Sequence, residues 1–503
     1  MRNLPGLAAL LAGIAFAGGA DAAMTLNPRG TGQLLLFPYY TVQDGQSTLV
    51  SIVNTTDRAK LLHLYFREPY NARDVLDTYI YLGPHDTWTA NVFARDANGA
   101  ANLLTDDRSC SSLPANAPTL PDSRRYHAFL PDNYAGQNTD TGPQGANRTR
   151  EGSFEIFELG QIKAGTPLAA AVTATNGAPT CANVAQADLG AALEAPGGGL
   201  YGTFAIVNAA QGTIMAGQAT AIDGFSNVSL WSPLAELPRY LMRAQTGADP
   251  NVVAALVPIG GELVSVEYLR DRAPDALSAL LMTESLYGDF QVDASAGAET
   301  EWVVNMPTKH YYVDKNMFDP QSPRTVRAPF TSLFGASPGY SCTAYDVDLY
   351  DRDQRAIPIF PEIIGVPPPN HRSLYTLCFS TEVLRFTARA YADPDDEPLP
   401  PYSLPPHSAV LGSRASTLIA DIDTTGLRNG TGRLQLGANA TPTVLPAGIE
   451  GPALRGLPVI GFEATRYING NVVPGVLANY TYASPLRGRA ACANASGAEI
   501  ACP

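Results

Sequence analysis

The sequence has little lysine, no closely paired cysteines and no long apolar run beyond its first residues. Only four of its 33 basic residues are lysines, and 47 acidic residues leave a formal net charge of −14. Nucleic acids and anionic lipids bind through a basic footprint, so this balance argues against both as partners. No Cys-x-x-Cys spacing occurs, which argues against zinc fingers, haem attachment and thioredoxin-like redox chemistry.

Motifs of several enzyme classes are also missing. The chain has no His-Glu-x-x-His zinc motif and no phosphate-binding loop. Its six histidines are scattered, with no pair at the spacing of metal ligands. A catalytic dyad can still assemble from distant segments, because such sites are recognised by geometry and not by order. The sequence therefore favours a non-enzymatic protein and leaves an enzyme as the alternative.

The first 22 residues have the pattern of a secretory signal peptide. Arg2 is the positive start, residues 7–17 are apolar, and Ala20-Asp21-Ala22 is a small-x-small cleavage site. We expect cleavage after Ala22 and export to the cell surface or the extracellular space, with the periplasm as the alternative. Beyond this segment the most apolar stretch is residues 252–259, far shorter than the ~20 residues of a membrane helix. No transmembrane anchor is expected.

The cysteine content agrees with an oxidising compartment. The six cysteines can pair in about 15 ways, and we expect each to pair with its nearest neighbour along the chain. The expected disulfides are Cys110–Cys181, Cys342–Cys378 and Cys492–Cys502. Buried free thiols are the alternative interpretation.

Glycine, proline and alternating apolar residues predict a mainly β fold. The chain has 45 glycines and 41 prolines, which suits a protein rich in turns. Leu62, Leu64 and Phe66 alternate with polar or amphipathic neighbours, and Asp44-Gly45 is a typical hairpin turn. Short strands with period-2 patterning and turns between them indicate antiparallel β-sandwich modules of the Ig-like kind, in tandem.

The chain divides into a signal peptide and three predicted parts. Residues 23–232 are predicted to form a β-sandwich domain with a long loop at 94–150. Residues 233–297 are predicted to be a short helical connection, with helices over 234–245 and 274–287. Residues 298–503 are predicted to form a second β-rich domain, with a loop rich in proline and acidic residues at 392–408.

Acidic residues provide the candidate metal and catalytic groups. Asp346 and Asp348 point the same way on an extended strand, which can suit Ca²⁺; a solvated strand face is the alternative. Glu155 and Glu158 suggest the carboxylate pair of a glycosidase. However, residues three apart face opposite sides of a strand. Calcium is the one possible cofactor that the sequence suggests.

Tyrosines provide the candidate ligand-binding residues. The chain has 23 of them, and aromatic rings stack on sugars and other ligands. His310, Tyr311 and Tyr312 lie together and form the candidate set, while ordinary strand packing is the alternative.

Three segments resemble those of a group of uncharacterised exported proteins from Gram-negative bacteria. They are residues 32–42 (GQLLLFPYYTV) with 54–56 (NTT), 301–310 (EWVVNMPTKH), and 457–462 (LPVIGF) with 477–480 (LANY). The resemblance spans both halves of the chain and implies export and a bacterial origin. It carries no catalytic residues.

These observations lead to a non-enzymatic exported protein with a role in structure, adhesion or assembly. Its expected partners are further copies of itself, other surface proteins or glycans, since exposed strand edges can pair between subunits. The alternative is a secreted glycan-binding protein or hydrolase that uses the carboxylate and tyrosine clusters.

Overall fold

The computed structural model describes most of the chain. The described residues are 23–174, 177–232, 240–293, 295–314, 325–335, 341–357, 375–389, 408–415, 418–423, 429–437, 443–469, 478–494 and 496–502. The expected signal peptide at 1–22 lies outside them, as does the expected loop at 392–408 except for its last residue. The described chain is mainly β with several antiparallel sheets, which confirms that part of the expected fold.

The first sheet has ten strands and comes from the N-terminal half of the chain. β3 and β5 are buried along their whole length, and β11 along nearly all of it, so these three form the centre of the sheet. In order the strands are β17 (Glu262–Leu269), β16 (Val252–Ile259), β1 (Met24–Leu26), β15 (Thr220–Asp223), β3 (Leu34–Thr41), β11 (Glu151–Ile162), β5 (Lys60–Arg67), β6 (Asp74–Leu82) and β9 (Cys110–Ser111), with β12 (Leu193–Glu194) beside β11. The pairing is antiparallel except between β1 and β16.

The second sheet has seven strands and lies against the first. Its order is β10 (Tyr126–Ala128), β8 (Ala101–Leu104), β7 (Thr87–Ala94), β4 (Gln46–Asn54), β13 (Leu200–Asn208) and β14 (Thr213–Gln218), with β2 (Thr31–Gly32) beside β13. The core between the two sheets contains Phe37, whose ring stacks on Phe154 at 4.1 Å and meets Phe204 of β13 edge-on at 6.4 Å. The two sheets therefore pack face to face.

The C-terminal half contains the third and fourth sheets. The third has β22 (Ala356–Ile357), β21 (Thr343–Asp351), β26 (Asn429–Gln435), β19 (Ser285–Gln291) and β32 (Arg487–Arg489) in order, with β23 (Tyr375–Leu377) beside β21. The fourth has β25 (Leu418–Asp423), β24 (Thr381–Arg389), β20 (Ala298–Asn305), β30 (Ile460–Tyr467) and β31 (Tyr480–Pro485). Phe386 of β24 stacks on Phe290 of β19 at 5.3 Å and meets Trp302 of β20 at 4.9 Å, so these two sheets also share a core.

Two small sheets and short helices complete the described structure. β18 (Met282–Thr283) pairs with β29 (Leu457–Pro458), and the other small sheet contains β27 (Val444–Leu445), β28 (Ala453–Arg455), β33 (Ala491–Ala493) and β34 (Glu499–Ile500). The α-helices are α1 (Pro167–Val172), α2 (Leu189–Ala192), α3 (Ala273–Leu281) and α4 (His310–Val313). The 3-10 helices are η1 (Gln43–Gly45), η2 (Gly136–Asn138), η3 (Ala146–Arg150), η4 (Cys181–Gln186), η5 (Tyr240–Arg243) and η6 (Arg270–Arg272).

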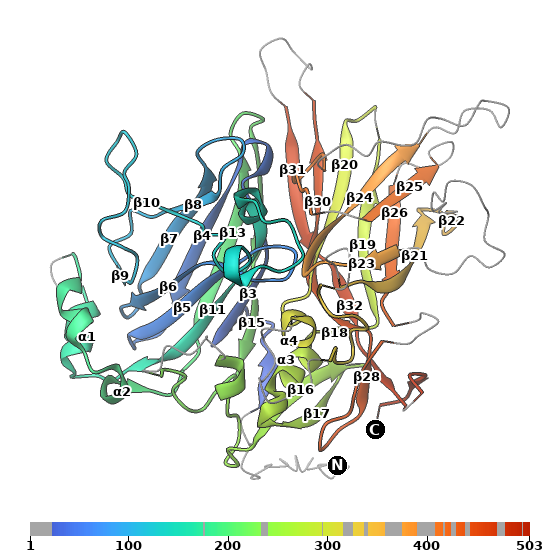
Figure 1. Cartoon of the computed structure of the whole chain (residues 1–503). Helices are drawn as coiled ribbons and strands as arrows, with labels where there is room; N and C mark the ends of the chain where they lie inside the picture. Colours follow the sequence, from blue (N-terminus) through green and yellow to red (C-terminus); the bar gives the residue numbers. More distant parts are fainter. Residues whose placement is uncertain are drawn as a thin grey trace, which may run out of the picture.

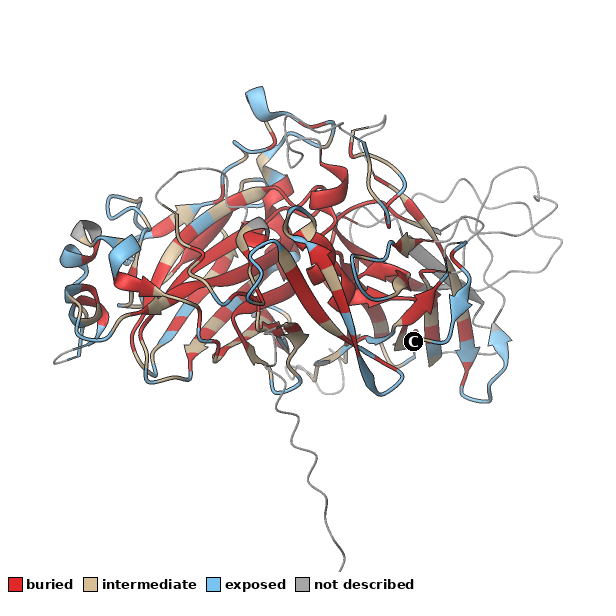
Figure 2. Ribbon diagram, turned by 90° about the horizontal axis from the view of Figure 1, so that it is seen from below, coloured by how far each residue is buried: buried red, intermediate tan, exposed pale blue. Residues whose placement is uncertain are grey.

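The two halves lie side by side and share buried side chains (Figure 1). β20 is buried on both faces because successive side chains of a strand point in opposite directions. Trp302 and Val304 face the core of the C-terminal half, whereas Val303 joins the core between the first and second sheets. Phe462 of β30 likewise lies 5.6 Å from Phe204, measured between ring centroids. Seen from below, buried residues run through both halves (Figure 2).

The expected helical connection at 233–297 contains more strand than helix. Residues 252–269 form the β16–β17 hairpin, whose turn uses the positive φ angles of Gly260 and Gly261. This hairpin joins the first sheet through β1, so that sheet extends past residue 232. The helix expected over 274–287 ends at Leu281, because the following residues pair with β29 and β26. Of the helix expected over 234–245, residues 240–243 are helical and 233–239 lie outside the described residues. Tertiary strand pairing here outweighs local helix signals.

The expected long loop at 94–150 contains β8, β9 and β10, η2 and η3, with irregular segments between them. It is tied to the sheets at several points. The guanidinium of Arg150 donates hydrogen bonds to the carbonyls of Val42, Asp96 and Gly99.

All three expected disulfides are present. They join Cys110 to Cys181, Cys342 to Cys378 and Cys492 to Cys502, and no cysteine is free. In the chain-entropy model each contributes about 3–4.5 kcal/mol by restricting the unfolded chain. In the described residues, no helix is both long and apolar enough to cross a membrane.

Candidate functional site

A buried network of charged side chains lies where the two halves meet. We call Glu68, Arg73, Asp140, Arg148 and Asp314 the charged seam. Arg148 is 2 % exposed; it donates to Glu68 at 2.6 Å and to both oxygens of Asp140 at 2.7 Å. Arg73 follows β5 and donates to both oxygens of Asp314, which follows α4 of the other half, at 2.7 and 2.9 Å.

Each carboxylate of the seam accepts a hydrogen bond from one of its two arginines. Burial raises the pKa of Asp140, but the hydrogen bonds and charge of Arg148 outweigh this, so the pKa lies below its usual value. Burial lowers the pKa of Arg148, but its partners Glu68 and Asp140 hold this pKa above its usual value. Asn71 adds a hydrogen bond of 3.0 Å to Asp314. The contacts of Arg73 and Asn71 with Asp314 therefore join the two halves, and removing one partner would leave a buried charge unpaired.

The two glutamates considered for a glycosidase, Glu155 and Glu158, each pair with a cation of β5. Glu155 accepts a hydrogen bond of 2.7 Å from Arg67, and Glu158 accepts one of 2.7 Å from Lys60. Burial raises the pKa of both carboxyl groups, and the neighbouring cation opposes this in each case. The side chains of Lys60 and Glu158 are 0 % exposed, so both are closed off from a substrate.

The candidate ligand-binding residues His310, Tyr311 and Tyr312 are together in α4, and all three are buried. The ring of Tyr312 is 0 % exposed, and its hydroxyl donates a hydrogen bond of 2.7 Å to Asp275 of α3. Burial, with the charges of Arg67 and Arg73, lowers the pKa of His310 well below its usual value. The structure thus places this set inside the protein, between α3 and the charged seam, and ligand binding by these residues stays a prediction.

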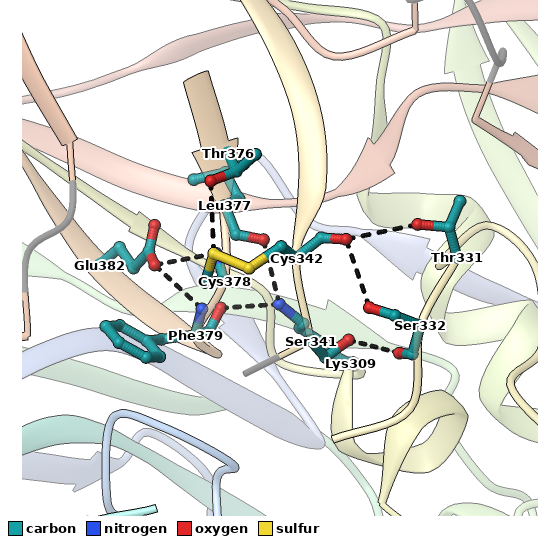
Figure 3. Close-up of a disulfide and its surroundings, with 10 residues drawn as sticks. All are labelled: Lys309, Thr331, Ser332, Ser341, Cys342, Thr376, Leu377, Cys378, Phe379 and Glu382. Carbon is teal, nitrogen blue, oxygen red and sulfur yellow. Dashed lines mark hydrogen bonds between the residues drawn. A yellow bond between two sulfur atoms is a disulfide. The ribbon is translucent and has the colours of Figure 1, made fainter. Parts of the chain in front are cut away.

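Lys309 precedes α4 and is buried beside the Cys342–Cys378 disulfide (Figure 3). Its ammonium group donates to the carbonyls of Phe379 at 3.1 Å and Leu377 at 3.4 Å. Glu382 accepts the backbone N–H groups of Cys378 and Phe379 at 2.9 and 3.0 Å. Burial lowers the pKa of Lys309 to about 7, although the charge of Glu382 acts in the opposite direction. These contacts fix the turn between β23 and β24.

The candidate calcium residues lie on β21 and face β26. The register places Asp346 opposite Gln435 and Asp348 opposite Arg433. Asp348 accepts a hydrogen bond from Gln435 and lies 4.0 Å from the guanidinium of Arg433. Nowhere in the described ranges do three or more His, Cys, Asp or Glu side chains come together in a way that could hold a metal ion. Calcium binding by this pair stays a prediction.

Two short motifs of enzyme families occur outside the setting those families need. Gly335-Ala336-Ser337-Pro338-Gly339 has Gly-x-Ser-x-Gly spacing, but a nucleophile elbow joins a strand to a helix. Here residues 336–340 lie outside the described residues, and the chain continues into the strand β21. Gly197, Gly199 and Gly202 have the spacing of a dinucleotide loop. They lead into β13, and the N–H groups of Gly197 and Gly198 bind Glu158 at 2.9 and 2.8 Å.

The outer face of the second sheet differs from all these sites because it has no charged residue. Its inward side chains, such as Val50, Trp88 and Phe204, belong to the core. The outward ones alternate with them on β4, β7, β8, β13 and β14, and we call them the neutral face: Ser47, Leu49, Ser51, Val53, Thr87, Thr89, Asn91, Phe93, Asn102, Leu104, Tyr201, Thr203, Ala205, Val207, Ile214, Ala216 and Gln218.

The neutral face is hollowed and partly apolar. A hollow of about 790 Å³ lies over it. Leu49 is 42 % exposed and Ile214 is 57 % exposed. Asp106 and Arg124 are the charged residues at the rim of the hollow, 3.7 Å apart, and Arg124 also pairs with Asp122 at 2.7 Å. The strand alternation predicts which residues point outward, but the sequence analysis did not single out this face, because the five strands become neighbours only in the folded sheet.

No protein-family model, curated protein or solved structure matches the chain. The fold and these sites together define a mainly β, disulfide-bonded protein with a buried charged seam and with no charged side chain among the outward residues of the neutral face.

Proposed function

We propose that the protein is an exported, non-catalytic protein of the cell surface or extracellular space that assembles with further copies of itself through the neutral face. Its architecture is that of tandem, Ig-like β-sandwich modules. The observation that carries the proposal is the absence of charged side chains from the outer face of β4, β7, β8, β13 and β14. The pairing of Glu155 with Arg67 and of Glu158 with Lys60, together with the burial of His310, supports a non-catalytic role.

Charge explains why a second copy is the partner that suits this face. Each chain has a formal net charge of −14, so two copies repel each other at most surfaces. The central parts of protein interfaces are depleted in charged residues. The neutral face is therefore where two copies approach at the smallest electrostatic cost, and exposed Leu49 and Ile214 add apolar area to be buried.

The oligomeric state of the mature chain, residues 23–503, tests the proposal. We expect sedimentation velocity to show concentration-dependent assembly of the wild type. The double variant Thr89→Glu/Ala205→Glu places two carboxylates on the neutral face and should remain monomeric. Ala170→Glu in α1, which is exposed and outside the face, is the matched control and should assemble like the wild type. A monomeric wild type, or a face variant that assembles normally, contradicts the proposal.

Export is tested separately. Fractionation of cells that express the full chain, with immunogold labelling, should place the protein outside the cytosol. Mass spectrometry should show a mature chain that begins at Ala23. A cytosolic, full-length protein contradicts this part of the proposal.

A further inference from the structure

A second depression, which we call the groove, lies between the two halves. It has a volume of about 1050 Å³ and is bordered by β1, β14, β16 and β17 on one side and by β30 and β31 on the other. This volume is at the upper end of the range for small-molecule sites, about 300–1000 Å³. The side chains and backbone around it belong to elements that the cores of both halves hold in place.

The lining of the groove is predominantly apolar. Phe204 and Phe462, at 3 % and 5 % exposed, belong to the core next to it. Leu256 and Leu263 contribute the wall formed by the β16–β17 hairpin, and Leu263 remains 65 % exposed at the rim. Covering Leu263 with an apolar ligand is favourable, because removing apolar surface from water lowers the free energy.

A single charged residue lines the groove. Arg487, at the start of β32, is exposed, and its guanidinium makes no hydrogen bond or ion pair with the residues that the structure describes. The remaining lining residues are uncharged. A ligand that complements these features combines an aliphatic part for the walls with one negative charge for Arg487.

We infer that the groove binds an aliphatic monocarboxylate, with its hydrocarbon chain along the apolar walls and its carboxylate beside Arg487. Guanidinium and carboxylate form two parallel hydrogen bonds, a geometry that a cationic or neutral head group does not reproduce. The affinity should depend on the length of the hydrocarbon chain because of the apolar walls, and on the charge of the head group because of Arg487. These two contributions to binding can be measured independently.

Titration calorimetry of the mature wild-type chain with dodecanoate, below its micelle concentration, tests the inference. We expect dodecanoate to bind at least about tenfold more tightly than dodecyltrimethylammonium, because only the carboxylate complements Arg487. Octanoate, which is four methylenes shorter, should bind at least about tenfold more weakly than dodecanoate. Equal binding of the anionic and cationic amphiphiles, or no binding of dodecanoate, overturns the inference.

Matched variants locate the site. Arg487→Glu should weaken dodecanoate binding by at least about tenfold and leave dodecanol binding unchanged, whereas Arg352→Glu, at an exposed arginine outside the groove, should change neither. Leu263→Glu should weaken both ligands. Leu269→Glu is its control on the same strand, since Leu269 is 48 % exposed and does not line the groove. Equal effects of a variant and its control overturn the inference.

The choice of variants separates this site from the proposed self-assembly. Phe204, Ala216, Gly217 and Gln218 line both the groove and the hollow of the neutral face. The variants at Arg487 and Leu263 change the groove alone, and we expect their sedimentation to match that of the wild type.

Discussion

The charged seam and the neutral face use charge in opposite ways. The seam brings five ionisable groups into the interior between the two halves, each paired with a partner at 2.6–2.9 Å. The neutral face spreads seventeen uncharged, outward-pointing side chains over five strands, and all but Asn102 and Leu104 are at least partly exposed. Most proteins show the reverse distribution, with charges outside and apolar groups inside. The chain thus buries part of its charge between the two halves, while the outward side chains of five strands carry none; the proposed self-assembly would use that second region.

The largest expected effect comes from breaking the seam. Arg148→Met leaves the carboxylates of Glu68 and Asp140 buried without their shared cation, and we expect the free energy of unfolding to fall by about 3–5 kcal/mol. Urea denaturation measures the loss. The control is Arg124→Met, which removes an exposed pair with Asp122 and should cost less than about 1 kcal/mol. Equal losses in the two variants would remove the distinction between the seam and the surface.

A second effect comes from Lys309, close to the seam. Because burial lowers its pKa from 10.5 to about 7, the unfolded chain binds a proton between these values that the folded chain does not. Its contribution to stability therefore increases from about pH 7 towards pH 10.5, by at most about 1.4 kcal/mol per pH unit. Lys309→Met should remove this increase. Urea midpoints of both proteins between pH 7 and 9.5 provide the measurement, and parallel pH profiles would contradict the prediction.

His310 should produce a smaller effect on the acidic side. Its pKa is lowered in the folded chain by burial and by Arg67 and Arg73, so below about pH 6.5 only the unfolded chain takes up the proton. The folded state then loses stability as the pH falls. His310→Leu should reduce the decrease in thermal midpoint between pH 7 and 5. His85→Leu, at a ring that is 61 % exposed, is the control.

The smallest effect is expected on the neutral face. Thr89→Glu should change the free energy of unfolding by less than about 0.5 kcal/mol, because the side chain points outward. Ala90→Glu, at the next residue, points into the core and should destabilise the protein by several kcal/mol, since an unpaired charge would be buried. Circular dichroism during urea denaturation compares the two. Similar losses would show that the face is part of the packed interior.

Local sequence patterns predicted the strands and the disulfides more reliably than the connection between the halves. The alternation of Leu62, Leu64 and Phe66 corresponds to β5, and the cysteines pair with their nearest neighbours. The helix expected over 274–287 stops at Leu281 because the next residues pair with strands more than 140 positions away. A helical signal in a short segment cannot include that competition.

The candidate site was the least predictable part. His310, Tyr311 and Tyr312 share a short helix, as their proximity in the sequence implies, but their burial depends on α3 and on Arg67 and Arg73. Glu155 and Glu158 each meet a cation from β5, which the register of β11 against β5 decides.

By itself the sequence determined the mainly β character, because the period of two along a strand is a short-range feature. Pairing each cysteine with its nearest neighbour along the chain predicted the three disulfides, at separations of 71, 36 and 10 residues. Only the tertiary structure decided which charges meet in the seam and which strands line up to form an uncharged face. Arg73 and Asp314 are 241 positions apart, and such contacts arise from the pairing and packing of whole sheets.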